Sequence, residues 1–261
     1  MNILEKIISE KRQEIVRHKE AVSQKTLEDF IREKPDCISF KQSLLDSPTG
    51  IISEFKRRSP SKDWIFKTAK VEDVVPQYAA SGAVAISVLT DEPFFGGTLN
   101  DLKTARSLVP KTPLLRKDFM VDEYQLYQAR ALGADVILLI ASALSVPQTK
   151  VLACAAHALG LEVLLEIHSE EELGHINEHV DVVGINNRNL STFKTDIQIS
   201  YDLGEKIPAD FVKISESGIS QPETVLELRQ AGFRGFLMGE NFMKTGQPGA
   251  TLKEFIASMS I

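Results

Sequence analysis

Eight short apolar runs, each followed by a stretch with helical patterning, fill the chain from residue 50 onward. The runs are almost continuously apolar, which is typical of parallel strands covered by helices on their outer face. The predicted strands are residues 50–55, 83–90, 113–119, 135–142, 162–167, 181–187, 211–217 and 235–242. The predicted helices are residues 70–82, 98–109, 122–134, 146–159, 169–179, 197–206, 221–231 and 248–259. Eight such units within about 250 residues predict an α/β fold, the (β/α)8 or TIM barrel.

An open, doubly wound sheet is the alternative arrangement for alternating strands and helices. Such sheets normally carry a G-x-G-x-x-G turn after a strand, and the sequence contains neither this motif nor a P-loop. The closed barrel is therefore favoured.

Residues 1–48 differ in texture from the rest of the chain and contain no strand pattern. Apolar residues recur there at helical spacing among charged ones: Ile3, Leu4, Ile7, Ile8, Ile15 and Val16. This spacing predicts an amphipathic helix, and a second helix is predicted to begin near Thr26, with Thr26 as its N-cap. We expect one TIM-barrel domain over residues 1–261, with a helical N-terminal extension at 1–48 and eight βα units at 49–261.

The composition excludes several classes of partner. The chain has 30 Lys and Arg against 36 Asp and Glu, a formal net charge of −6 at pH 7, which argues against a nucleic-acid-binding surface. Two cysteines cannot form a disulfide framework, and Cys154 lies in an apolar helical run where we expect it to be buried. The charged first residues do not match a signal peptide, and no apolar run approaches the roughly 20 residues of a membrane span. We expect a cytoplasmic protein with no nucleic-acid or membrane partner.

Two histidines have a spacing that can bind a metal ion. His175 and His179 are four residues apart on a predicted helix, but they flank Glu178 in a charged segment. Such a segment is more typical of a solvated surface, so we expect no metal site.

Polar side chains gather at the carboxyl ends of five predicted strands: Glu54, Lys56, Lys117, Glu166, Asn186 and Glu216. In a TIM barrel these ends form the mouth, where catalytic groups come from several strands. Glu54 and Lys56 are two residues apart and therefore share a face of their strand. Lysines and glutamates that meet in a pocket shift the pKa values of one another, so the pattern favours acid–base chemistry.

Small residues follow the last two strands, in Glu216-Ser217-Gly218 and Met238-Gly239-Glu240. They allow backbone N–H groups to approach an anion, and many barrels bind phosphate at this position. The loop after the first strand, RRSPSKDWIF, is long enough to fold over the mouth. Its Arg57, Arg58 and Lys62 are compatible with two roles, a solvated face or, next to an anion site, the attraction of an acidic substrate.

Six segments of the chain resemble the indole-3-glycerol-phosphate synthase family. They are EFKRRSPSK (54–62), LLRKDF (114–119), LLEIHSEEEL (164–173), GINNRNLSTFKTD (184–196), SESGI (215–219) and LMGE (237–240). With the helical extension, the resemblance spans nearly the whole chain. It implies a monofunctional carboxy-lyase of tryptophan biosynthesis that needs no cofactor. The reaction converts 1-(2-carboxyphenylamino)-1-deoxyribulose 5-phosphate to indole-3-glycerol phosphate, carbon dioxide and water. The sequence leaves the oligomeric state open, with a monomer as one option.

The resemblance also implies roles for the polar residues at the strand ends. Lys117 is the general acid for ring closure, and Glu166 is the acid–base partner in dehydration. Glu54 and Asn186 position the reacting groups. The division of acid and base roles among Lys56, Lys117 and Glu166 stays open. The full catalytic set is Lys117, Glu166, Glu54, Lys56, Asn186, Glu216 and Ser217.

Substrate-binding residues follow from the same resemblance. Lys56 and Arg188 match partners for the anionic groups of the substrate, and Phe95 and Phe119 match the apolar wall around its aromatic ring. The phosphate end matches Ser59, Ser217, Gly218, Gly239 and the backbone N–H of Glu240.

Two positions depart from the pattern of the family. Asp63 stands where many relatives have Gly, and Glu240 stands where others have Ser. A carboxylate cannot donate to phosphate, so any contact from Glu240 should come from its backbone.

Two other functions are compatible with a barrel of this kind. The first is an isomerase acting on a phosphoribosyl amine, which would favour a Cys and an Asp at the strand ends. The second is a phosphosugar-binding protein without activity. The presence of Lys117, Glu166, Glu54 and Asn186 together favours the carboxy-lyase.

Overall fold

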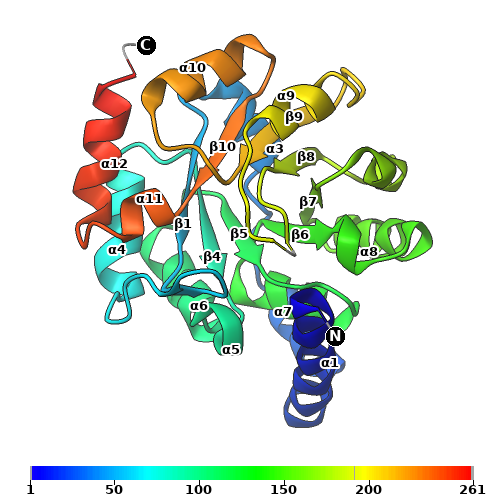
Figure 1. Cartoon of the computed structure of the whole chain (residues 1–261). Coiled ribbons are helices and arrows are strands. Elements are labelled where there is room, and N and C mark those ends of the chain that lie inside the picture. Colours follow the sequence, from blue (N-terminus) through cyan, green and yellow to red (C-terminus); the bar gives the residue numbers. More distant parts are fainter. Residues whose placement is uncertain (1, 191, 260–261) are drawn as a thin grey trace.

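The computed structural model describes residues 2–190 and 192–259, and its centre is a closed ring of eight parallel strands (Figure 1). The strands are β1 (Ile51–Phe55), β4 (Ala85–Leu89), β5 (Leu114–Lys117), β6 (Val136–Ile140), β7 (Glu162–Ile167), β8 (Val182–Asn186), β9 (Val212–Glu216) and β10 (Gly235–Met238). Each strand pairs with the next, and β1 closes the ring on β10 through the pairing of Ile51 with Phe236. The predicted TIM barrel is confirmed.

Helices cover the outside of the ring (Figure 1). The main ones are α4 (Val71–Ala80), α6 (Leu99–Leu108), α7 (Tyr124–Leu132), α8 (Val146–Ala158), α9 (Gln198–Gly204), α10 (Pro222–Gln230) and α12 (Pro248–Ala257). Shorter elements are α5 (Glu92–Phe95), α11 (Glu240–Met243) and the 3-10 helices η1 (Ala141–Ala143) and η2 (Glu170–His175). Among the described helices, none is long and apolar enough to cross a membrane.

Two predicted elements differ from the structure. The segment 169–179 forms only η2, because the Asn177 side chain bonds the backbone at His175 and His179 and competes with helix continuation. The predicted strand 235–242 ends at Met238, because the backbone turns at Gly239 into α11.

The N-terminal extension is helical, as predicted, and consists of α1 (Ile3–Ala21), α2 (Gln24–Ile31) and α3 (Phe40–Asp46). Ser23 rather than Thr26 caps α2, since its hydroxyl oxygen accepts from the Thr26 N–H at 3.1 Å. In α3, Phe40 and Leu44 are fully buried against residues that begin the strands, such as Val136 and Val182. Helix α3 therefore closes the amino-terminal end of the barrel.

Alternation along the strands divides the core into two apolar clusters. One lies between the ring and its helices, and the other fills the interior of the ring with residues such as Ile52, Leu115, Leu164 and Ile214. Successive strand residues point to opposite faces, so the residue two positions after each interior residue points inward as well. Those next positions are charged: Glu54, Lys117, Glu166 and Glu216. The apolar interior thus ends in a charged layer at the carboxyl ends of the strands.

Candidate active site

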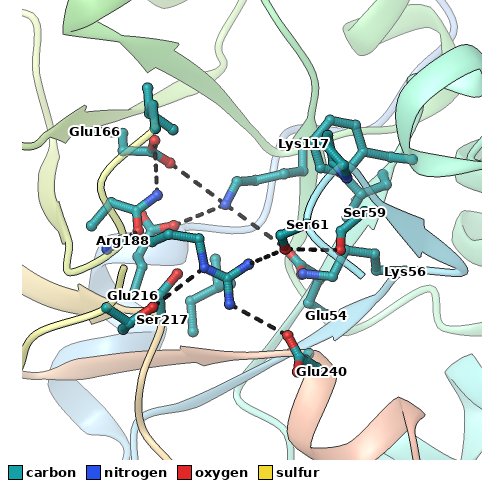
Figure 2. A pocket seen from close by; sticks show the side chains of 18 of the residues that line it. Glu54, Lys56, Ser59, Ser61, Lys117, Glu166, Arg188, Glu216, Ser217 and Glu240 are labelled. Atoms are coloured by element: carbon teal, nitrogen blue, oxygen red, sulfur yellow. Dashed lines mark hydrogen bonds and ion pairs between the residues drawn. The ribbon is translucent and has the colours of Figure 1, made fainter. Parts of the chain in front are cut away.

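Lys117, at the end of β5, lies at the centre of this charged layer (Figure 2). Its Nζ is 2.8 Å from Glu216 Oε2, 3.6 Å from Glu166 Oε2 and 3.7 Å from Glu54 Oε2. The three carboxylates come from β9, β7 and β1, so one ammonium group links strands from across the barrel.

Two further predicted residues contact this cluster. Lys56 Nζ lies 2.7 Å from Glu54 Oε1, as the shared strand face predicts. Asn186, at the end of β8, donates from Nδ2 to Glu166 Oε1 at 3.1 Å. Glu54 and Glu166 therefore each have one oxygen held by a neighbour and the other directed toward Lys117.

Burial and charge act against each other on the central groups. Burial alone would lower the pKa of Lys117, but the three surrounding carboxylates raise it above its usual value. Burial alone would raise the pKa of Glu166, but Lys117, His168 and Asn186 together lower it to about 2. Lys117 is held as an ammonium and Glu166 as a carboxylate.

The pKa of Glu216 shifts in the opposite direction to that of Glu166. Burial and the nearby Glu166 and Glu54 outweigh the attraction of Lys117 and raise the pKa of Glu216 to about 7. Within the described residues, Glu216 Oε1 is buried without a hydrogen-bond partner. The space beside it exists because residue 184 is Gly: a Cβ there would lie 2.5 Å from Glu216 Oε1. Sequence reasoning placed Gly184 in a motif but gave it no role.

All the residues that the sequence analysis assigned to the site line one cavity of about 360 Å³ at the barrel mouth. Phe95 and Phe119 line it as neighbours, with ring centroids 6.0 Å apart and the rings tilted by 39°. Ile3, Leu4 and Ile7 of α1 line the same cavity. The sequence analysis missed this contribution, although α1 was predicted to have an apolar face.

Positive backbone φ angles shape the far end of the cavity. Ser217 and Gly218 have φ of 67° and 79°, and the Ser217 carbonyl accepts from Asn187 Nδ2 at 3.0 Å. Gly239 is needed for a different reason, because a Cβ there would lie 2.6 Å from Glu54 Oε1. The loops after β9 and β10 therefore meet the carboxylate cluster at short range.

The side chain of Glu240 lines this end of the cavity as well. It accepts from Arg188 Nη2 at 3.3 Å, and Lys62 Nζ lies 4.0 Å away (Figure 2). Arg188 also donates to Ser61 at 3.3 Å. The carboxylate at position 240 therefore pairs with the cation that the sequence analysis assigned to substrate binding.

Two of the three cations in the loop after β1 have partners away from the cavity. Arg57 forms a bidentate ion pair with Asp101, and Arg58 bonds Asp63 and the Pro93 carbonyl, so neither faces the cavity. The loop contains a short hairpin, β2 (Arg58–Ser59) with β3 (Asp63–Trp64), which was not predicted. Asp63 holds a φ of 55°, a conformation that favours glycine.

Lys11 of α1 forms a second buried charge cluster that sequence reasoning missed. Its Nζ lies 3.0 Å from Asp91, 3.0 Å from Asp118 and 3.1 Å from Glu14, and 1% of the side chain is exposed. Asp118 also pairs with the fully buried Arg116 at 2.9 Å. One signal was available, since Lys11 is four residues from both Ile7 and Ile15 and shares their buried helix face.

The expectation for Cys154 is wrong, and the two spaced histidines have contacts of their own. Cys154 is exposed rather than buried. The described residues contain no group of three or more His, Cys, Asp or Glu arranged to hold a metal ion. His175 bonds Thr149 at 2.8 Å, and His179 stacks edge-on against His157.

The fold and the site define a TIM-barrel protein with a buried cluster of lysine and glutamate side chains at the carboxyl ends of its strands. The sequence profile of the family described as indole-3-glycerol phosphate synthase matches residues 4–255. The chain belongs to the indole-3-glycerol phosphate synthase family.

Individual proteins agree with this assignment. The indole-3-glycerol phosphate synthase of Bacteroides thetaiotaomicron is 57% identical over 258 residues, with 99% of each chain covered. That of Magnetococcus marinus is 40% identical over 264 residues, with 98% of each chain covered. A mutant tryptophan synthase alpha-subunit from Pyrococcus furiosus superposes with a TM-score of 0.60 at 17% identity, covering 81% of this chain and 97% of that one. This last likeness shows the barrel fold alone.

Proposed function

We propose that this protein converts 1-(2-carboxyphenylamino)-1-deoxyribulose 5-phosphate to indole-3-glycerol phosphate, carbon dioxide and water. The observation that carries the proposal is the position of Lys117, whose ammonium group lies among Glu216, Glu166 and Glu54 at the mouth of the barrel. The assignment to the synthase family supports the same reaction.

Ring closure is the first step. The ring carbon that bears the carboxylate attacks the ketone carbon, a carbon–carbon bond forms, and the ketone oxygen takes up a proton as its charge develops. Lys117 is the general acid, because its raised pKa keeps it protonated and its Nζ faces the cavity. The carbon–carboxylate bond then breaks, carbon dioxide leaves, and its electron pair returns to the ring.

Dehydration completes the indole. The new hydroxyl leaves as water after a cavity ammonium protonates it, and a base removes a proton so that the ring becomes aromatic. Glu166 is the base, since its lowered pKa keeps it ionised and Asn186 holds its Oε1. Lys56 and Lys117 both lie within the cavity as donors for the leaving hydroxyl.

The two ends of the cavity suit the two ends of the substrate. Phe95 and Phe119 form the wall for the aromatic ring. The phosphate binds at the opposite end, among Ser59, Gly218, Gly239 and the backbone of Glu240, with Ser217 between it and the carboxylates. Arg188 and Lys56 face the remaining anionic groups. Glu240 competes for Arg188 until an anion arrives.

The wider setting is part of the same proposal. Residues 1–261 act as one domain on a small-molecule substrate in the cytoplasm, with neither nucleic acid nor membrane as a partner. The reaction consists of proton transfers and carbon–carbon bond changes, for which the ionisable groups of the cavity supply donors and acceptors.

The test is a fluorescence assay for the indole product with purified protein and the carboxyphenylamino ribulose phosphate. Turnover without added metal is the expected result. Binding of the substrate with no product would instead support a phosphosugar-binding protein, and conversion of a phosphoribosyl amine by isomerisation would support the other alternative.

A further inference from the structure

His168 lies between two carboxylates at the edge of the site. Its Nε2 is 3.1 Å from Glu166 Oε1, and its Nδ1 is 3.3 Å from Glu172 Oε2. Nε2 is buried and makes no hydrogen bond within the described part of the chain, so its contact with Glu166 Oε1 is an ion pair without hydrogen-bond geometry. The ring therefore connects Glu166 to a second acidic residue outside the cluster around Lys117.

Local structure fixes this arrangement. Strand β7 ends at Ile167, and the His168 backbone N–H donates to Glu172 Oε2 at 2.6 Å as the chain turns into η2. The Ser142 hydroxyl of η1 donates to the other oxygen of Glu172 and lies 3.2 Å from His168 Nδ1. Glu172 is thereby oriented toward the ring by two neighbouring elements.

Both carboxylates favour the protonated ring. Burial alone would lower the pKa of His168, but the contacts with Glu166 and Glu172 outweigh it and raise the pKa to about 10. His168 is therefore an imidazolium at neutral pH.

The imidazolium adds positive charge beside Glu166. The groups that contact Glu166 are Lys117 of β5, Asn186 of β8 and His168, and Lys117 is shared with Glu216 of β9 and Glu54 of β1. Glu166 shares the Lys117 ammonium group with Glu54 and Glu216. His168 is a second cation beside Glu166, and it pairs with Glu172 as well.

We infer that His168 is a positioning residue that holds Glu166 as an oriented carboxylate for the dehydration step. Asn186 donates a hydrogen bond to Glu166 Oε1 and the His168 ring forms an ion pair with the same oxygen, which leaves Oε2 directed at Lys117. This role rests on the proposed function, because it matters only if Glu166 removes a proton during the reaction.

A kinetic experiment separates this role from a merely structural one. His168→Gln keeps a donor near the position of Nε2 and removes the charge, and His157→Gln changes a surface histidine paired with Asp181 as the matched control. Single-turnover rates are measured across the acidic and neutral range, so that product release does not mask the chemical steps. In His168→Gln, the acidic limb of the pH–rate profile should move to higher pH by about 1 unit or more, because Glu166 loses a neighbouring positive charge. The KM of the variant should stay within about threefold of the wild-type value. The His157→Gln profile should match the wild type.

An NMR titration tests the charge of the His168 ring in the absence of substrate. The chain has five histidines, and the spectrum of His168→Gln identifies the His168 resonances by their absence. The His168 ring should stay doubly protonated through neutral pH, and Glu172→Gln should lower its titration midpoint. A ring that is neutral at about pH 7 overturns the inference.

Two results of the kinetic experiment would contradict the role of His168. An unshifted acidic limb in His168→Gln overturns the inference, as does a loss of rate that is uniform across pH. A wild type that forms no product rejects the proposed function and this role with it, whereas the NMR result still reports the charge of the ring.

Discussion

Lys11 of α1 places its ammonium nitrogen 3.0 Å from Asp118, the residue that directly follows Lys117. The N-terminal helix is thereby joined by charge to the strand that carries the central lysine of the site. Asp91, after β4, contacts the same nitrogen, so Lys11 also holds the loop that leads to Phe95.

Lys11→Met should destabilise the protein by about 3–5 kcal/mol, because it leaves Asp118 and Asp91 buried without their shared partner. Urea unfolding monitored by circular dichroism measures the change. Lys19→Met is the matched control. Lys19 lies on the same helix as Lys11 and forms an exposed ion pair with Asp122, so its substitution should cost at most about 1 kcal/mol. Equal losses in the two variants would show that burial of the Lys11 cluster is without consequence.

Lys117→Ala should lower kcat by roughly a hundredfold or more, because the developing alkoxide loses its proton donor. Glu166→Gln should cause a loss of similar size through the missing base. The fluorescence assay measures both, with the exposed Lys103→Ala as a control that keeps full activity. Full activity in both site variants would contradict the roles given to these residues.

Gly184→Ala should reduce activity by at least about tenfold, because its Cβ would enter the space of Glu216 Oε1 and displace that carboxyl group. Gly174→Ala introduces the same methyl group where no atom lies within 4 Å, and its activity should be unchanged. Measured kcat and KM values of the two variants test this prediction. Comparable activities would mean that the position of Glu216 is not critical.

The pKa of Glu216 predicts a pH dependence of stability with a definite sign. A carboxyl group whose pKa is raised to about 7 in the folded state, from about 4.3 when unfolded, favours folding while it is protonated. This contribution is lost as pH rises from about 4.3 through about 7. Glu216→Gln should therefore be more stable than the wild type at about pH 8, by roughly 3–4 kcal/mol, and the gap should close at about pH 4. Urea midpoints at several pH values test this, and a gap that widens at low pH would contradict it.

The fold was predictable because its signals are local. Continuous apolar runs identify buried parallel strands, and the period of two is enough to place Glu54 and Lys56 side by side on one strand face. The prediction failed where a side chain competes with the backbone, as at Asn177, and where a turn begins early, as at Gly239.

The site was predictable to the extent that its residues belong to strand ends. Arg116, Lys117 and Asp118 are adjacent and all charged, and only the strand register shows that Lys117 alone of the three points to the carboxylate cluster. The partner of Asp118 is Lys11, far away in sequence, which no local pattern reveals. The role of Arg57 stayed open for the same reason, since its partner Asp101 lies on α6.

Strand β1 pairs with β10, so the first strand of the ring obtains its second neighbour only when the last strand is in place. During synthesis on the ribosome, Glu54 emerges well before the loop at Gly239 that encloses it. A nascent chain that stops before β10 already contains Lys117 and all three of its carboxylates, but its ring is open and an unpaired strand edge is exposed. Catalytic competence should therefore appear only after β10 has emerged and closed the ring.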